Sequence, residues 1–322
     1  MPVVFPEPTF ITINGIRMAV YEAGPKDGPP VVLAHGWPEL AYAWRHQLKA
    51  LGEAGYHAMA PDQRGYGLTE KPCVIREYDI HHLTADMAGL LDAFGHDRAV
   101  FAGHDWGGIM VWQMALLHPG RVAGVIGAGA PFFPRSRRDP EQVMREAWGP
   151  DWYICDFQDS RRADEAMLTN VEAIFTNQFR KLTRSYAEYQ ALPKEDRNRT
   201  IQKRIDPRPG RVFLSDAERQ VYIDTYRRTG FTSTIDWYRN WSWNWESTAD
   251  VEQKIRVPCL YIQAADDPAV PPGFGDDMEQ YIDDVERYRV EDCGHCIQQE
   301  HPEEVTRAML DWLGRKYPGQ AG

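Results

Sequence analysis

Short apolar runs alternate with amphipathic segments in the first and last parts of the chain. Two runs rich in β-branched and aromatic residues, Phe10–Ile13 and Ile16–Tyr21, flank Asn14-Gly15, which is typical of a tight β-hairpin. Later runs are continuously apolar, which predicts strands buried on both faces. These strands are Pro30–Ala34, His57–Ala60, Ala99–Ala102, Val122–Ala128 and Val257–Ile262, and a further strand is expected at Val285–Val290.

Segments with helical spacing lie between the predicted strands. The expected helices are Ala41–Ala54, Leu83–Phe94, Trp106–Leu117 and, near the C-terminus, about Pro302–Gly314. Gly95 and His118-Pro119-Gly120 end two of them, as glycine and proline do. Such β-α alternation predicts an α/β fold, in which a mostly parallel sheet carries helices on both faces.

The alternation stops between residues 134 and 245. This stretch contains no short apolar strand, and its charged, helical-looking segments are rich in Trp, Tyr and Arg. Strand character returns at Val257. We therefore predict a core formed by residues 1–133 and 246–322, interrupted by a helical insertion over residues 134–245.

Composition narrows the class of protein. The 322 residues carry 47 Asp and Glu against 36 Lys and Arg, a net charge of −11, which disfavours a nucleic-acid partner. The N-terminus lacks a secretory signal, and no apolar run approaches a membrane span. Five cysteines without framework spacing favour reduced thiols. We expect a cytoplasmic protein without a membrane or nucleic-acid partner, either a monomer or a homodimer.

One turn carries a reactive group. The segment Gly103-His104-Asp105-Trp106-Gly107-Gly108 lies between a predicted strand and a predicted helix. A side chain on so sharp a turn is exposed at the edge of the sheet, where a nucleophile is usually found. The residue here is Asp105, so a serine hydrolase is excluded, although an Asp before a helix is also a common N-cap.

Three further segments follow other predicted strands. His35-Gly36-Trp37-Pro38 stands where this kind of fold places N–H donors for an oxyanion, and Asp266-Asp267 and His295 lie in two late loops. The chain order is therefore nucleophile, acid, histidine, as in an α/β-hydrolase triad.

On these segments the chain resembles the α/β-hydrolase superfamily and, within it, the epoxide hydrolases. The matching residues are His35–Leu40, Asp62–Gly67, Gly103–Gly108 and Asp292–His295. The resemblance covers about two-thirds of the chain, and it implies that the insertion is a helical cap over the active site. The family pattern also favours Asp267 over Asp266 as the triad acid.

An Asp nucleophile determines the chemistry that we expect. A carboxylate is ionised near neutrality and can attack an electrophilic carbon, forming an ester with the enzyme. His295 would then activate the water that hydrolyses the ester, and an acid at its other ring nitrogen would orient it. The backbone N–H groups of Trp37 and Trp106 are candidates for the oxyanion hole.

The leaving group separates the possible reactions. An epoxide needs a proton donor for its alkoxide, and the family resemblance implies two cap tyrosines, which match Tyr153 and Tyr238. The resemblance thus implies hydrolysis of a small apolar epoxide by water to a vicinal diol. A haloalkane or haloacid dehalogenase with the same nucleophile is the alternative, and a non-catalytic ligand-binding protein ranks third.

No cofactor or metal is expected. His35 and His81-His82 lack an acidic partner at the spacing of metal ligands. Gly65-Tyr66-Gly67 is not followed by a nucleotide fingerprint.

Overall fold

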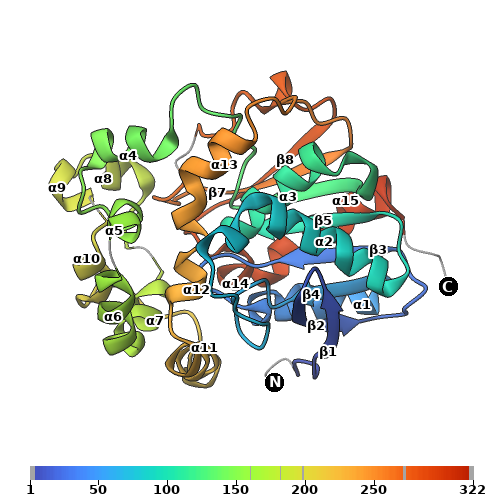
Figure 1. Ribbon diagram of the computed structural model, residues 1–322, viewed down its shortest axis with the longest axis horizontal. Coiled ribbons are helices and arrows are strands. Elements are labelled where there is room, and N and C mark those ends of the chain that lie inside the picture. Colours follow the sequence, from blue (N-terminus) through green and yellow to red (C-terminus); the bar gives the residue numbers. More distant parts are fainter. Residues whose placement is uncertain (1–3, 160, 182, 198, 271–272, 319–322) are drawn as a thin grey trace. The chain divides into compact units, whose positions relative to one another are not determined.

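The computed structural model describes residues 4–159, 161–181, 183–197, 199–270 and 273–318 (Figure 1). Over its described residues the chain divides into two compact units. The first contains residues 1–71, 80–134 and 251–322, and the second contains residues 72–79 and 135–250.

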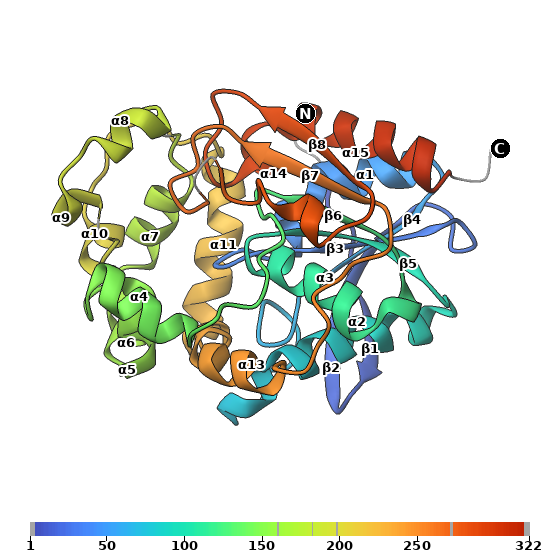
Figure 2. The same ribbon diagram turned by 90° about the horizontal axis from the view of Figure 1, so that it is seen from above.

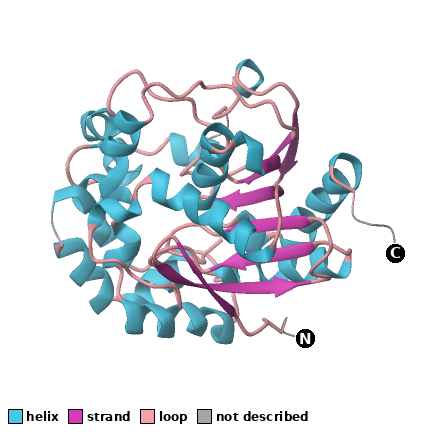
Figure 3. Ribbon diagram, turned by 45° about the vertical axis from the view of Figure 1, so that its right-hand side comes forward, coloured by secondary structure: helices cyan, strands magenta, loops and turns pink. Residues whose placement is uncertain are grey.

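A sheet that has eight strands among the described residues forms the centre of the first unit (Figure 3). Its order is β1-β2-β4-β3-β5-β6-β7-β8. The hairpin of β1 (Thr9–Ile13) and β2 (Ile16–Ala23) is antiparallel, and β2 also runs antiparallel to β4, whereas the other neighbours are parallel. The parallel strands are β3 (Pro30–Ala34), β4 (His57–Pro61), β5 (Ala99–His104), β6 (Val122–Ala128), β7 (Cys259–Ala264) and β8 (Val285–Val290). The predicted α/β class is thereby confirmed.

Two pairs of helices cover the two faces of this sheet (Figure 2). On one face α1 (Arg45–Glu53) packs on α15 (Pro302–Lys316), and their apolar side chains join those of the strands in one core cluster. On the other face α2 (Ile80–Phe94) packs on α3 (Trp106–Leu117). The parallel strands β3 to β7 are therefore buried on both faces, as their apolar runs predict, whereas the edge strand β8 is partly exposed.

The shorter elements of the first unit are η1 (Ala41–Trp44), η3 (Pro119–Arg121), η5 (Met278–Gln280) and α14 (Ile297–Glu300). One helix prediction needs correction here. The expected single helix Ala41–Ala54 is a 3-10 turn followed by α1, because Trp44 leaves helical backbone angles where the two meet. Its indole is fully buried in the core cluster, so packing of Trp44 outweighs the local helical pattern.

The second unit is helical over its described residues and has an aromatic centre. Phe175 of α7 lies 5.6 Å from Tyr222 and 5.0 Å from Tyr226 of α11, measured between ring centroids. The elements are η2 (Ile75–Tyr78), α4 (Pro140–Trp148), α5 (Tyr153–Asp159), α6 (Arg162–Thr169), α7 (Val171–Gln178), α8 (Tyr186–Gln190), α9 (Lys194–Arg197), α10 (Ile201–Ile205), α11 (Asp216–Thr229), α12 (Thr232–Ile235), η4 (Tyr238–Asn240) and α13 (Trp241–Ser247).

The segment that holds η2 joins this unit although it precedes the predicted insertion. The side-chain amide of Asn240 donates to the Ile75 carbonyl at 2.6 Å and accepts from Arg76 at 3.1 Å. No helix of either unit, within the described residues, is long and apolar enough to cross a membrane.

Candidate active site

Asp105 occupies the sharp turn between β5 and α3. Its φ is +51°, a left-handed value that costs a non-glycine residue conformational energy and therefore usually marks a functional position. The crossing is tight, because a Cβ on Gly107 would lie 2.1 Å from the Ala34 carbonyl oxygen. Glycine at this position lets the turn press against the end of β3, where Asp105 projects from the sheet edge.

The loop after β3 provides the first contact of the nucleophile. The backbone N–H of Trp37 donates to Oδ1 of Asp105 at 2.7 Å. Gly36 makes this approach possible, since a Cβ there would lie 2.5 Å from the Asp105 Cβ. Trp106, the second residue expected at an oxyanion hole, follows Asp105 directly as the first residue of α3.

The loops after β7 and β8 bring an acid and a histidine to the same edge of the sheet. His295 Nε2 lies 3.4 Å from Oδ2 of Asp105, and His295 Nδ1 lies 2.7 Å from Oδ2 of Asp267. The Asp267 carboxylate is only 1% exposed, and its Oδ1 accepts from the Ala269 N–H at 2.7 Å. Three side chains from distant parts of the sequence thus form one continuous row.

The groups of this row shift one another's pKa values. Burial raises the pKa of Asp105, but the hydrogen bond and charge of His295 and the Trp37 N–H lower it to about 2. Burial lowers the pKa of His295, but the carboxylates of Asp267 and Asp105 outweigh burial and raise it to about 10. In the resting protein, the arrangement at neutral pH is therefore carboxylate, imidazolium, carboxylate.

A buried polar network lies behind the row, and the sequence analysis did not anticipate it. His104 Nδ1 lies 2.8 Å from Glu39, and His104 Nε2 lies 2.7 Å from the backbone carbonyl of His295. Gln298 and Gln299 both donate to the Glu39 carboxylate. Burial raises the pKa of Glu39, but the charge of His104 and their hydrogen bond lower it overall. The network fixes the backbone on which His295 is carried.

The sequence pattern points to two residues of this network but not to their contact. Glu39 belongs to the segment His35–Leu40 and His104 directly precedes Asp105, so both lie beside candidate residues. Their pairing depends on the adjacency of β3 and β5, which only the fold provides.

The two candidate tyrosines lie together in the second unit. Tyr153 opens α5 and Tyr238 opens η4, and their ring centroids are 6.2 Å apart. Phe157 contacts both rings, at 5.5 Å and 5.2 Å. The side-chain amide of Gln158 donates to the Tyr238 carbonyl at 2.8 Å, which ties α5 to η4. Both tyrosines are nearly buried, with 7% and 3% of their surfaces exposed.

Within the described part of the chain, one group of side chains has the spacing of metal ligands. Ligand atoms of Cys293, Glu300 and His301 lie within 4.8 Å of one another. These groups already have protein partners: Glu300 accepts from the Gly294 N–H, and His301 lies 3.1 Å from the Asp292 carbonyl.

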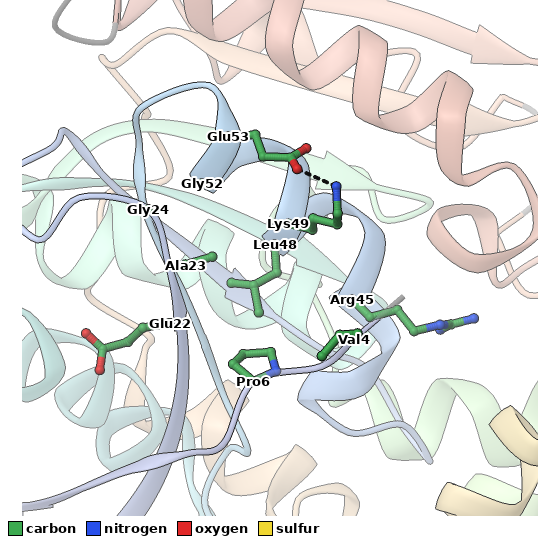
Figure 4. A pocket seen from close by; sticks show the side chains of 10 residues that line it. All are labelled: Val4, Pro6, Glu22, Ala23, Gly24, Arg45, Leu48, Lys49, Gly52 and Glu53. Atoms are coloured by element: carbon green, nitrogen blue, oxygen red, sulfur yellow. Dashed lines mark hydrogen bonds and ion pairs between the residues drawn. The ribbon is translucent and has the colours of Figure 1, made fainter. Parts of the chain in front are cut away.

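A cavity of about 390 Å³ also belongs to the first unit (Figure 4). Pro6 and Leu48 present apolar surface to it, and the ion pair of Lys49 with Glu53 lies at its wall. None of the triad candidates lines it, so this cavity is separate from the candidate site.

Comparisons with known proteins identify the family and the fold of the chain. The family model described as alpha/beta hydrolase fold matches residues 29–302. Epoxide hydrolase A of Mycobacterium tuberculosis is 42% identical over 96% of this chain and 97% of its own length. Bifunctional epoxide hydrolase 2 of Mus musculus is 36% identical over 94% of this chain and 55% of its own length.

Solved structures extend this similarity to three dimensions. The crystal structure of epoxide hydrolase A from Mycobacterium thermoresistibile superimposes with a TM-score of 0.88 at 39% identity. The superposition covers 96% of this chain and 98% of the solved chain. Epoxide hydrolase VrEH1 from Vigna radiata gives a TM-score of 0.84 at 31% identity, with the same coverage of both chains.

Proposed function

The chain belongs to the α/β-hydrolase fold family and, within it, to the epoxide hydrolases, and on this premise we propose that it converts an epoxide and water to a vicinal diol through an ester on Asp105. The observation that carries the mechanism is the row of Asp105, His295 and Asp267, with contacts of 3.4 Å and 2.7 Å.

Ester formation is the first step. A carboxylate oxygen of Asp105 attacks one carbon of the epoxide ring and forms the C–O bond of the ester, while the bond from that carbon to the ring oxygen breaks. The ring oxygen takes a proton from Tyr153 or Tyr238, so the alkoxide leaves as a hydroxyl and a phenolate remains. The low pKa of Asp105, about 2, keeps the nucleophile ionised without help from a base.

Hydrolysis of the ester is the second step. Esterification removes the negative charge of Asp105, one cause of the raised pKa of His295, so the imidazolium can release its proton and restore the phenol. Neutral His295 then takes a proton from water, which attacks the Asp105 carbonyl. The oxyanion accepts from the N–H groups of Trp37 and Trp106. When it collapses, the ester C–O bond breaks and the leaving alkoxide takes the proton held by His295, which gives the diol. The Asp105 carboxyl group then returns its proton to His295, and the resting charges are restored.

The surroundings of the tyrosines support a small apolar substrate. Phe157 is fully buried and contacts both phenol rings, so an apolar side chain lies against both proposed proton donors. Such surroundings favour hydrocarbon substituents over charged ones.

The decisive experiment uses His295→Gln, which lacks the base. The variant is incubated with styrene oxide, and the intact protein and its peptides are weighed. We expect the mass of the opened epoxide on the Asp105 peptide, with Asp105→Asn as the unreactive control. A parallel incubation with 1-chlorobutane should leave the mass unchanged. An adduct with the chloroalkane and none with the epoxide would contradict the proposal.

The tyrosines are tested in the same His295→Gln background. Tyr153→Phe and Tyr238→Phe should each slow adduct formation, because each removes a proton donor. Tyr189→Phe is the matched control, since the Tyr189 hydroxyl donates to the Arg197 carbonyl within the second unit. Unchanged alkylation in both tyrosine variants would remove their assignment as acids and leave the ester mechanism in place.

A further inference from the structure

Arg204 is a buried cation that lies against one of the two proposed proton donors. It belongs to α10, it is 7% exposed, and its guanidinium carbon lies 4.0 Å from the centroid of the Tyr153 ring. Arg199 lies farther from the same ring, at 5.6 Å. A buried guanidinium over an aromatic face is more effective than an exposed one, because water does not screen it.

Backbone and side-chain contacts hold Arg204 in this position. The Asn177 side chain donates to the carbonyls of Arg204, Ile205 and Asp206, at 2.8, 3.2 and 2.9 Å, and so fixes the end of α10 on α7. The Tyr153 N–H donates to the Arg199 carbonyl at 3.0 Å, which ties the start of α5 to the segment before α10. The distance between Arg204 and the phenol is therefore set by the fold of this unit.

Electrostatic coupling reaches both tyrosines. Burial lowers the pKa of Arg204, whereas its interactions with Tyr153 and Tyr238 raise it. Arg199 lowers it through charge repulsion. Stabilisation between a cation and two phenols is mutual, so Arg204 favours negative charge on their oxygens.

We infer that Arg204 is a positioning residue for ester formation, which stabilises the phenolate left on Tyr153, and to a lesser degree on Tyr238, when the proton passes to the epoxide oxygen. The inference rests on the proposed function, because it needs a tyrosine that acts as an acid. The step itself is one proton transfer: the phenol O–H bond breaks, the new alcohol O–H bond forms, and Arg204 keeps its proton throughout.

The experiment measures the rate of Asp105 alkylation by styrene oxide against pH, in the full chain carrying His295→Gln. In Arg204→Met we expect the plateau rate to fall about threefold to tenfold, because a change of about one pKa unit in the acid corresponds to at most about a tenfold change in the rate of proton transfer. The alkaline limb, where the tyrosine loses its proton, should move up by about one pH unit. A purely structural role would lower the rate and leave the limb in place.

Two variants serve as controls. Arg208→Gln removes a neighbouring cation whose guanidinium donates to the Lys203 carbonyl, so neither the rate nor the limb should change. Arg204→Lys keeps the charge and most of the stem, so its limb should stay near that of the parent. If Arg204→Met does not fold, Arg204→Lys tests the inference instead. An alkaline limb that moves by a full pH unit in Arg204→Lys would overturn the inference.

The background of Tyr153→Phe separates this inference from the proposed function. Arg204→Met should slow alkylation much less there, because the phenol that it serves is absent. If Tyr153→Phe slows alkylation and Arg204→Met does not, the inference on Arg204 is wrong and the acid role stands. If neither variant of Tyr153 or Tyr238 slows alkylation, the acid role fails, and the inference fails with it.

Discussion

Replacing Asp267 with Asn should separate the two halves of the reaction. The carboxylate of Asp267 lies 2.7 Å from His295 Nδ1, on the side of the ring that faces away from Asp105. The substitution keeps the shape of the side chain and removes its charge. Ester formation needs only ionised Asp105 and a proton donor, so it should proceed, whereas the hydrolysis step needs His295 as a base and should fail.

The size of the effect follows from the electrostatics of His295. Its pKa is raised from 6.5 to about 10, which corresponds to about 5 kcal/mol in favour of the imidazolium. Asp267 is the largest favourable cause, and assigning it half of this gives about 2–3 kcal/mol, or a hundredfold in rate. An Asn can also hold the ring in the wrong tautomer, so we expect hydrolysis to slow about 10²- to 10⁴-fold.

Rapid mixing with styrene oxide, followed by intact-mass analysis, measures both steps. The adduct should form in Asp267→Asn at a rate within about threefold of the wild type and then persist. Asp266→Asn is the matched control, because the adjacent Asp266 competes for the acid role in the sequence, whereas the carboxylate on His295 Nδ1 is that of Asp267. Wild-type turnover in Asp267→Asn, or an adduct that persists in Asp266→Asn instead, would refute the reasoning.

Other substitutions test the packing and charge around the site. Gly36→Ala places a Cβ 2.5 Å from that of Asp105, so the rate of Asp105 alkylation should fall about tenfold to a hundredfold in single-turnover assays. An unchanged rate would show that this close approach does not position the nucleophile. Asp86→Asn removes the negative charge 2.7 Å from the Arg64 guanidinium, which is 1% exposed, so urea unfolding should show a loss of about 3–5 kcal/mol. A loss below about 1 kcal/mol is the contrary result. Because the folded pKa of His295 is raised from 6.5 to about 10, its contribution to stability is full below pH 6.5 and lost as pH rises through 10. The stability gap between wild type and His295→Gln should accordingly narrow from pH 7 to pH 10, and a constant gap is incompatible with this linkage.

The fold was predictable because its central strands are apolar on both faces. The run Val122–Ala128 is short and apolar, which favours a central strand of a parallel sheet, and the structure has that strand with the same bounds. The long-range partner of a strand is not encoded locally. The predicted strand Ile16–Tyr21 extends to Ala23 because its last residues pair with β4, beginning at Ala58.

The candidate site was predictable to the extent that chain order encodes it. Asp105, Asp267 and His295 each follow a parallel strand, and the carboxyl ends of such strands meet at one edge. Their catalytic roles stay proposals that the experiments above test. Glu39 also follows a parallel strand, but its partner His104 could not be predicted, because their contact joins segments that are distant in sequence. The same holds for the contact of Arg204 in α10 with Tyr153 in α5.

The charge pattern of the row also gives the reaction its order. In the resting protein His295 lies between two carboxylates, and with its pKa at about 10 it is an imidazolium at neutral pH and cannot act as a base. Its positive charge lowers the pKa of Asp105, so the same proton keeps the nucleophile ionised. When the ester forms, Asp105 loses its negative charge, and the imidazolium then keeps only one of its two carboxylate partners. In the proposed mechanism the base is therefore released by the formation of its own substrate, the ester, and His295 activates water only after that intermediate exists.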